Sequence, residues 1–398
     1  WLKFISSSLN PCSRRKSCKQ LYLSFSPSLN TMVRTDEEEG LTVEEEDDEE
    51  DEELEVEHIH GENTPLDQDT FGMALCSLTR DSHFLAEGFQ WPRCGRLMTA
   101  LLLLVFTISL QIAILVSTKK YASAKGVHDI RKAYGLFEET IYQCHGPDGK
   151  GDLNETLCME TKYGNVRGRR DARPPLDVQR SRLHSMTGDD QGDVCRIPLS
   201  QPFFFYLILL IWTLTCVSEL RKSLTLSMEI CKLKTVKSMS DALHRSTEEG
   251  SGEVVIIGLT CAVKIFMLFL LVVRVCITVY LLWVGCRWLL STNRFADLIL
   301  NAIALEFILL LKELVHSTLV PARNAIELSK TTLKLAKSDE KIKPGCKEFT
   351  GTVSILFLAM FWVWFYMYKF QEVLPEYQWD VHDVCVQYIK ERFNVSTR

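Results

Sequence analysis

The sequence predicts an all-α, polytopic integral membrane protein with about five transmembrane helices and a small disulfide-linked extracytoplasmic region. Its apolar residues are gathered into four or five long segments that carry few charges, and about 20 such residues are enough to cross the hydrocarbon core of a bilayer. Basic residues gather in two connecting segments, as is typical of cytoplasmic loops. Cysteines and N-glycosylation sequons occur in segments that the same topology places outside.

The N-terminal region lacks the composition of a folded domain. Residues 1–31 are interpreted as a non-native or upstream segment, because the chain opens on Trp1 and Met32 is a credible initiator. Residues 32–92 are expected to form an acidic, disordered cytoplasmic tail. Between positions 36 and 57 the sequence has sixteen acidic residues and no basic residue, and such a run repels itself and cannot bury a core.

The first two predicted membrane helices are 97–116 and 203–219. The first has twenty residues without a charge, with Arg96 before it and Lys119 after it, which is typical of a retained transmembrane helix. The second is shorter. The segment between them, 117–202, is expected to be an extracytoplasmic loop. Because it has few apolar residues, we expect it to depend on disulfides and on the C-terminal tail for stability.

The third, fourth and fifth predicted helices are 254–290, 295–316 and 352–370. The third is too long for one upright span and has no turn residues near its centre, so we expect a tilted helix whose Lys264 reaches the interface. Aromatic residues near the end of the fifth indicate a membrane-interface belt. The remaining segments are a basic cytoplasmic loop at 220–253, a basic cytoplasmic segment at 317–351 and an extracytoplasmic tail at 371–398.

This topology places the N-terminus in the cytoplasm and the C-terminus outside, in a eukaryotic endomembrane or plasma membrane. Asn154 and Asn394 lie in Asn-x-Ser/Thr sequons and are candidate glycosylation sites. The outside segments also hold an even number of cysteines, which predicts two disulfides whose connectivity the sequence leaves open among three possibilities. These cysteines are Cys144, Cys158, Cys195 and Cys385.

The fourth predicted helix carries many polar side chains for a membrane helix. Ile299, Ile303 and Phe307 begin an apolar stripe that continues along one face through Leu310 and Leu314. A charged side chain at mid-bilayer costs about 2.5 kcal/mol or more, so the charged groups should face protein or water. The candidates for a pathway or for intramembrane ion pairs are Arg274, Arg287, Asp297, Asn301, Glu306, Lys312 and Glu313.

The third and fourth helices should pack as antiparallel neighbours, because a short polar turn joins them. Counting from that turn predicts an ion pair between Arg287 and Asp297. It also predicts that Arg274 pairs with Glu306 or Glu313. Such charges are compatible with two roles: they hold the helices in register, or they line an aqueous pathway for cations or protons.

The leading functional hypothesis is therefore an ion channel or transporter subunit with a charged pathway between the third and fourth helices. The alternative is a non-transporting membrane adaptor or receptor-like subunit whose intramembrane charges are structural ion pairs. The expected partners are the lipid bilayer and either further copies of the chain or a partner membrane subunit. No enzyme activity, cofactor, metal ion or nucleic-acid partner is expected, because the sequence has no phosphate-binding loop, HExxH motif or GxSxG elbow.

Overall fold

The computed structural model describes residues 63–88, 90–145, 152–161, 164–237, 243–245, 254–334, 344–375 and 377–392. The predictions for residues 1–31, for the acidic run 36–57 and for Asn394 lie outside the described residues.

The described chain is mostly helical, which confirms the all-α class. The α-helices are α2 (Thr70–Glu87), α3 (Trp91–Ser117), α4 (Ala124–Tyr142), α5 (Leu176–His184), α6 (Gly188–Cys195), α7 (Pro202–Lys232), α8 (Cys261–Leu290), α9 (Phe295–Leu319), α10 (Ala322–Ser329), α11 (Pro344–Phe365) and α12 (Val381–Arg392). Shorter helical turns are η1 (Thr118–Ser123), η2 (Arg170–Ala172), η3 (Pro198–Ser200) and η5 (Tyr366–Phe370). The strands, each of three or four residues, are β1 (Asn63–Pro65), β2 (Cys158–Glu160), β3 (Val166–Gly168), β4 (Lys234–Val236), β5 (Leu243–Arg245), β6 (Val254–Ile256), β7 (Gly258–Thr260) and β8 (Thr331–Lys334).

Four helices of the described chain are long and apolar enough to cross a membrane, which is compatible with a multi-pass membrane protein. They are Trp91–Tyr142, Pro202–Lys232, Cys261–Leu290 and Phe349–Phe370. The first is one continuous helix of 52 residues, about 78 Å long at 1.5 Å per residue, so it extends well beyond a bilayer. The charged helix α9 is not among these four, and its crossing of the membrane stays a prediction.

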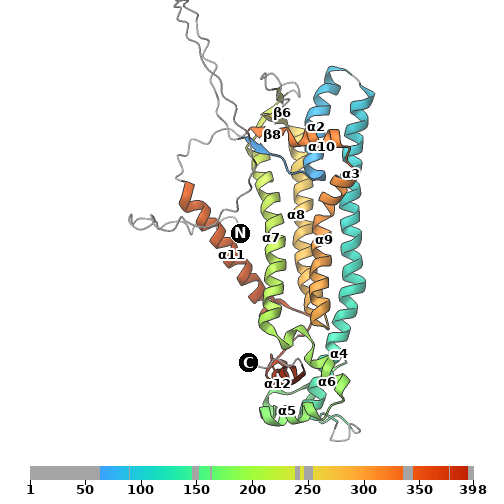
Figure 1. Ribbon diagram of the computed structural model, residues 1–398, viewed down its shortest axis with the longest axis vertical. Helices are drawn as coiled ribbons and strands as arrows, with labels where there is room; N and C mark the ends of the chain where they lie inside the picture. Colours follow the sequence, from blue (N-terminus) through green and yellow to red (C-terminus); the bar gives the residue numbers. More distant parts are fainter. Residues whose placement is uncertain are drawn as a thin grey trace, which may run out of the picture. The chain divides into compact units, whose positions relative to one another are not determined.

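Helices α3, α7, α8 and α9 run side by side and form the central bundle (Figure 1). Helices α7 and α8 make the most extensive contact, and α11 packs against α7. Gly285 allows the close approach of α8 to α7, because a Cβ at this position would lie 2.4 Å from Nε1 of Trp212. Apolar side chains such as Leu209, Leu282 and Leu305 fill the space between the helices.

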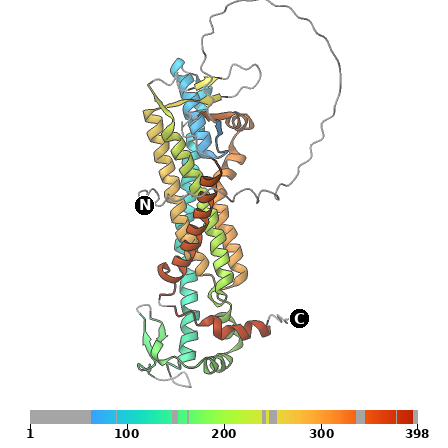
Figure 2. The ribbon, with the colours of Figure 1, turned by 90° about the vertical axis from the view of Figure 1, so that its left-hand side faces the viewer.

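At one end of the bundle, α4 joins α5, α6, α12 and the β2–β3 hairpin in a small subdomain, here called the cap. Figure 2 shows α12, at the C-terminal end of the described chain, beside the α5–α6 region. The structure confirms that the four selected cysteines form two disulfides, Cys144–Cys158 and Cys195–Cys385. The second joins α6 to α12, so the loop 117–202 does rest on the C-terminal segment.

At the opposite end, short strands make a mixed sheet in the order β1-β8-β6-β5, where β6 and β8 are parallel and the other pairs antiparallel. Strands β4 and β7 pair separately, in parallel. Helices α2 and α10 lie beside this sheet (Figure 1).

Two predicted boundaries at this end are wrong. Residues 63–92 were expected to belong to a disordered tail, but they form β1, α2 and the start of α3. The composition changes after the acidic run, and α2 buries Phe71 and Leu75, which are at most 1% exposed. The third membrane helix was expected to start at 254, but it starts at Cys261 because residues 254–260 pair as strands β6 and β7.

Four segments predicted as loops or tails contain helical structure. The predicted loop 117–202 contains α4, α5 and α6. Helix α7 continues past residue 219 to Lys232. The segment 317–351 contains α10 and β8. The tail 371–398 contains α12, which the disulfide holds against α6. In each segment, packing against a neighbouring element stabilises backbone structure that local polarity disfavours.

Candidate functional site

Four charged side chains from four elements meet inside the bundle, and we call them the charge network. Asp69 precedes α2, and Glu219, Arg274 and Lys312 belong to α7, α8 and α9. Asp69 Oδ2 lies 3.2 Å from Nη1 of Arg274 and 3.5 Å from Nζ of Lys312. Glu219 Oε2 lies 3.4 Å from Nη2 of Arg274 and 2.5 Å from Nζ of Lys312. Each carboxylate therefore contacts both bases.

The network lies deep in the bundle at one level. The side chains of Asp69, Arg274 and Lys312 are 3 to 5% exposed, and that of Glu219 is 11% exposed. Glu219, Arg274 and Lys312 stand sixteen or seventeen residues from the cap-side ends of their helices, which places each about 25 Å along its helix. A hydrocarbon core about 30 Å thick that began near those helix ends would contain the network.

Asp69 connects the network to the backbone of α2. Its Oδ1 accepts hydrogen bonds from the amides of Phe71 and Gly72, at 3.0 and 2.8 Å, and caps the helix N-terminus. Gly72 fits this turn because a Cβ there would lie 2.0 Å from the carbonyl oxygen of Asp67. Phe71 also packs against the Arg274 guanidinium, 4.9 Å from its ring centroid. The same carboxylate thus orders the start of α2 and neutralises two buried bases.

The four charges of the network balance one another. Burial of a lone charge is very costly, and removal of one partner from a buried ion pair costs about 3–5 kcal/mol. Lys222 adds a fifth charge at the edge, with Nζ 3.2 Å from Oε1 of Glu219 and a side chain that is 47% exposed. The network itself is therefore buried, and it reaches exposed surface at Lys222.

An open groove of about 700 Å³ reaches the network between α7 and α9, and we call it the lateral groove. Residues 67–69, in the segment that leads from β1 into α2, contribute to its lining. Network members Asp69 and Lys312 line it, together with Asp67, Lys222, Glu313 and His316. A smaller pocket of about 330 Å³ adjoins it through Asp67 and Lys222.

His316 contributes a buried nitrogen to the lateral groove. The residue is 6% exposed, and its Nε2 has no hydrogen-bond partner within the described part of the chain. Buried polar atoms are normally paired, so this nitrogen lacks the partner that a buried imidazole usually has.

The structure brings three of the seven predicted site residues to this region. Arg274 and Lys312 belong to the network, and Glu313 lines the groove. Asn301 lies elsewhere and donates to Oγ1 of Thr292 at 2.9 Å.

The predicted ion-pair partners are different in the structure. Arg274 contacts Asp69 and Glu219 in place of Glu306 or Glu313. Arg287 lies 3.9 Å from Glu372, which follows η5, in place of Asp297. Asp297 and Glu306 are exposed. Matching depths on two helices did not predict the partners, because the directions of the side chains around each helix decide which groups can meet.

Sequence reasoning missed both acidic members of the network. Glu219 stood at the end of the second predicted membrane helix, 203–219, and was not selected as a site residue. Asp69 lay in the predicted tail, although an Asp directly before an apolar helix is a typical N-cap signal. Its pairing with Arg274, 205 positions further along the chain, had no local signal.

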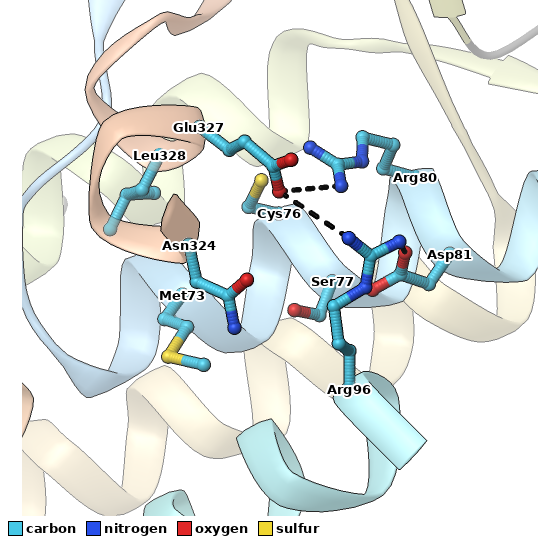
Figure 3. Close-up of a pocket in the computed structure, with 9 residues that line it drawn as sticks. All are labelled: Met73, Cys76, Ser77, Arg80, Asp81, Arg96, Asn324, Glu327 and Leu328. Atoms are coloured by element: carbon cyan, nitrogen blue, oxygen red, sulfur yellow. Dashed lines mark hydrogen bonds and ion pairs between the residues drawn. The ribbon is translucent and has the colours of Figure 1, made fainter. Parts of the chain in front are cut away.

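A second polar cluster joins α2, α3 and α10 near the sheet (Figure 3). Glu327 accepts from Arg80 at 2.6 Å and lies 3.7 Å from Arg96, which also pairs with Asp81 at 3.1 Å. Burial raises the pKa of the Asp81 carboxyl. The enclosed space is about 10 Å³, enough for about one water molecule, so this cluster is a structural clamp.

The cap holds a third buried cluster. Arg167 Nε lies 3.4 Å from Glu138, and Arg173 lies 3.9 Å from Asp380. The Tyr134 hydroxyl lies 3.4 Å from Oδ1 of Asp380. Burial raises the pKa of the Asp380 carboxyl above its ordinary value. Across the described residues, no group of three or more His, Cys, Asp or Glu side chains is arranged to hold a metal ion.

The fold and the site together are compatible with a multi-pass membrane protein that carries a buried charge network. No known protein family, curated protein or solved structure matches the chain. The function is therefore argued from the charge network and the lateral groove.

Proposed function

We propose that this protein is a membrane transport protein whose charge network is an intramembrane site for protons or monovalent cations. The observation that carries the proposal is the lateral groove of about 700 Å³, lined by Asp69 and Lys312 themselves. Charges that only held helices together would need no such access, whereas ionisable groups on a transport route must be reached from one side.

The packing on the cap side of the network also supports transport. There α7, α8 and α9 pack around apolar side chains, including Leu209, Leu282 and Leu305. The network is thus accessible through the groove and closed toward the cap. Access from one side at a time is the arrangement on which alternating-access transport depends.

We further propose that α9 crosses the membrane as a fifth span, with the cap outside and the sheet end in the cytoplasm. The cap contains both disulfides, which form in oxidising compartments. Asn154 of the first sequon is exposed on the cap and is available for glycosylation. Lysines and arginines gather in the segments near the sheet, as the positive-inside rule requires.

A receptor-like membrane subunit is the second candidate. The continuous helix Trp91–Tyr142 favours it, because one unbroken helix runs from the clamp with α2 and α10 into the core of the cap. The charge network would then fix the helices in register.

A flux measurement on the full chain in liposomes separates the two candidates. The double variant Glu219→Gln/Lys312→Met removes one charge of each sign and keeps the Asp69–Arg274 pair, so it should fold. We expect wild-type protein to carry protons or monovalent cations down an imposed gradient, and the double variant to carry them about tenfold more slowly. Glu306→Gln, an exposed change outside the groove, is the matched control.

Two outcomes would count against transport through this site. Equal flux in wild type and in the double variant would show that the charge network does not lie on the transport route. Folded wild-type protein that carries neither protons nor cations would favour the receptor-like subunit.

A further inference from the structure

The charges that face the lateral groove do not balance. The four network charges cancel, which leaves Asp67 and Glu313 against the single ammonium of Lys222. Lys222 is also engaged by Glu219 at 3.2 Å. Within the described residues, neither Asp67 nor Glu313 lies within 4.0 Å of a base. With His316 counted as neutral, the groove carries a net charge of −1 that its own side chains leave uncompensated.

The neighbouring pocket does not change this balance, because it adds one acid and one base, Glu229 and Arg221. One positive charge entering the lateral groove would therefore neutralise it. Partial burial strengthens such an attraction, since the local dielectric constant is lower than that of water.

Part of the lining of the lateral groove is apolar. Phe307, Leu310 and Leu314 of α9 line it and are 53%, 43% and 45% exposed. They belong to the stripe of α9 that faces away from the bundle core. An aromatic ring also favours a cation placed over its face. A ligand that suits this groove is thus apolar over most of its surface and positively charged at one point.

The buried Nε2 of His316 is a second, independent indication of a ligand. The atom has no hydrogen-bond partner among the described residues, and it belongs to a residue that is 6% exposed and lines the same groove. Most buried polar atoms in proteins are paired, so an unpaired one in a residue that lines an open groove is a candidate contact for a ligand.

We infer that the lateral groove binds a lipophilic organic cation with a single positive charge. This inference rests on the proposed transport function, because it names the class of cation that binds in the groove leading to the charge network. The carboxylates of Glu313 and Asp67 neutralise the ligand, and Phe307, Leu310 and Leu314 cover its apolar surface.

The test is equilibrium binding to the full chain in lipid nanodiscs, with two probes of nearly the same size and opposite charge. We expect tetraphenylphosphonium to bind saturably and tetraphenylborate to bind only as it does to empty nanodiscs. Glu313→Gln should raise the Kd for tetraphenylphosphonium about tenfold. Glu306→Gln removes the same charge from the same helix, seven residues away and outside the groove, and should leave the Kd unchanged.

Three results would overturn the inference: no saturable binding of the cation, equal binding of both probes, or equal effects of the two glutamate variants. Failure of the proposed function gives a different result. Glu313-dependent binding without any ion flux would leave the binding site in place and remove transport. Ion flux without binding of the cation would leave transport in place and remove the binding site.

Discussion

At the scale of single residues, Asp69 links local and long-range order in this protein. One carboxylate oxygen caps α2 and the other contacts Arg274 and Lys312. Formation of the α2 N-terminus therefore depends on the packing of α8 and α9 around Asp69. In turn, the buried bases Arg274 and Lys312 depend on Asp69 for neutralisation. Such mutual dependence favours cooperative folding, because each buried charge is neutralised by partners from other elements.

A second residue with a measurable effect is Asp380 in the cap, whose pKa is raised by burial from the ordinary 3.8. The folded cap thus holds this proton more tightly than the unfolded chain does. Its contribution to stability is fully present below about pH 3.8 and is lost as the pH rises through the raised value. Near neutral pH, the buried carboxylate lowers the stability of the cap.

We therefore expect Asp380→Asn to raise the thermal midpoint of the cap at neutral pH by about 2–4 °C, the shift that about 1 kcal/mol produces. In wild type, stability should fall between acid and neutral pH as Asp380 loses its proton, and this fall should be smaller in the variant. The fluorescence of Trp379, its neighbour, is the local reporter. Asp383→Asn is the control, because Asp383 is exposed. Equal effects of the two variants would contradict the role of burial.

At the scale of secondary-structure elements, the contact between α7 and α8 depends on a glycine. Gly285 leaves room for Trp212, whose Nε1 donates to the carbonyl oxygen of Leu282 at 3.4 Å. In helix packing within membranes, small residues permit close backbone approach and so increase van der Waals contact. The register of α7 against α8 positions Glu219 beside Arg274. This register therefore depends on the close contact between Gly285 and Trp212.

We expect Gly285→Ala to lower the stability of the protein by about 1–3 kcal/mol, the usual cost of overpacking. Gly351→Ala in α11 makes the same chemical change where a Cβ would meet nothing within 4 Å. It should be neutral, or stabilising by about 1 kcal/mol through helix propensity. Thermal unfolding in detergent measures both variants. If Gly285→Ala were as stable as Gly351→Ala, the close contact would not limit helix packing.

At the scale of the whole molecule, two disulfides hold the cap, and they close loops of very different length. Cys144 and Cys158 are 14 residues apart, whereas Cys195 and Cys385 are 190 residues apart. In the chain-entropy description, a crosslink stabilises the folded state more when it closes a longer loop. The Cys195–Cys385 bond also joins α12 to α6, and α7, α8, α9 and α11 all lie between these cysteines in the sequence.

We therefore expect loss of the Cys195–Cys385 bond, by Cys195→Ser/Cys385→Ser, to cost about 4–5 kcal/mol of stability. Loss of the shorter crosslink, by Cys144→Ser/Cys158→Ser, should cost about 3 kcal/mol. Chemical denaturation of the oxidised variants gives the comparison, with reduced wild type as the reference for loss of both bonds. A larger effect of the short crosslink would contradict the loop-length argument.

The sequence by itself determined the helical class, the positions of four long apolar segments and the cysteines that form disulfides. These properties are local, because hydrophobic runs, charge runs and residue types are read directly along the chain. It also drew attention to Arg274, Lys312 and Glu313, since charges within apolar helices need partners or water.

Only the tertiary structure decided which groups meet. Asp69 lay in a segment read as disordered tail, and residues 254–260 were read as the start of a membrane helix although they contain strands β6 and β7. The partners of Arg274 come from α7 and from the residue before α2, not from the adjacent helix α9. The physical reason is that an ion pair within a bundle depends on helix rotation and close packing among segments far apart in sequence, and no local pattern specifies these.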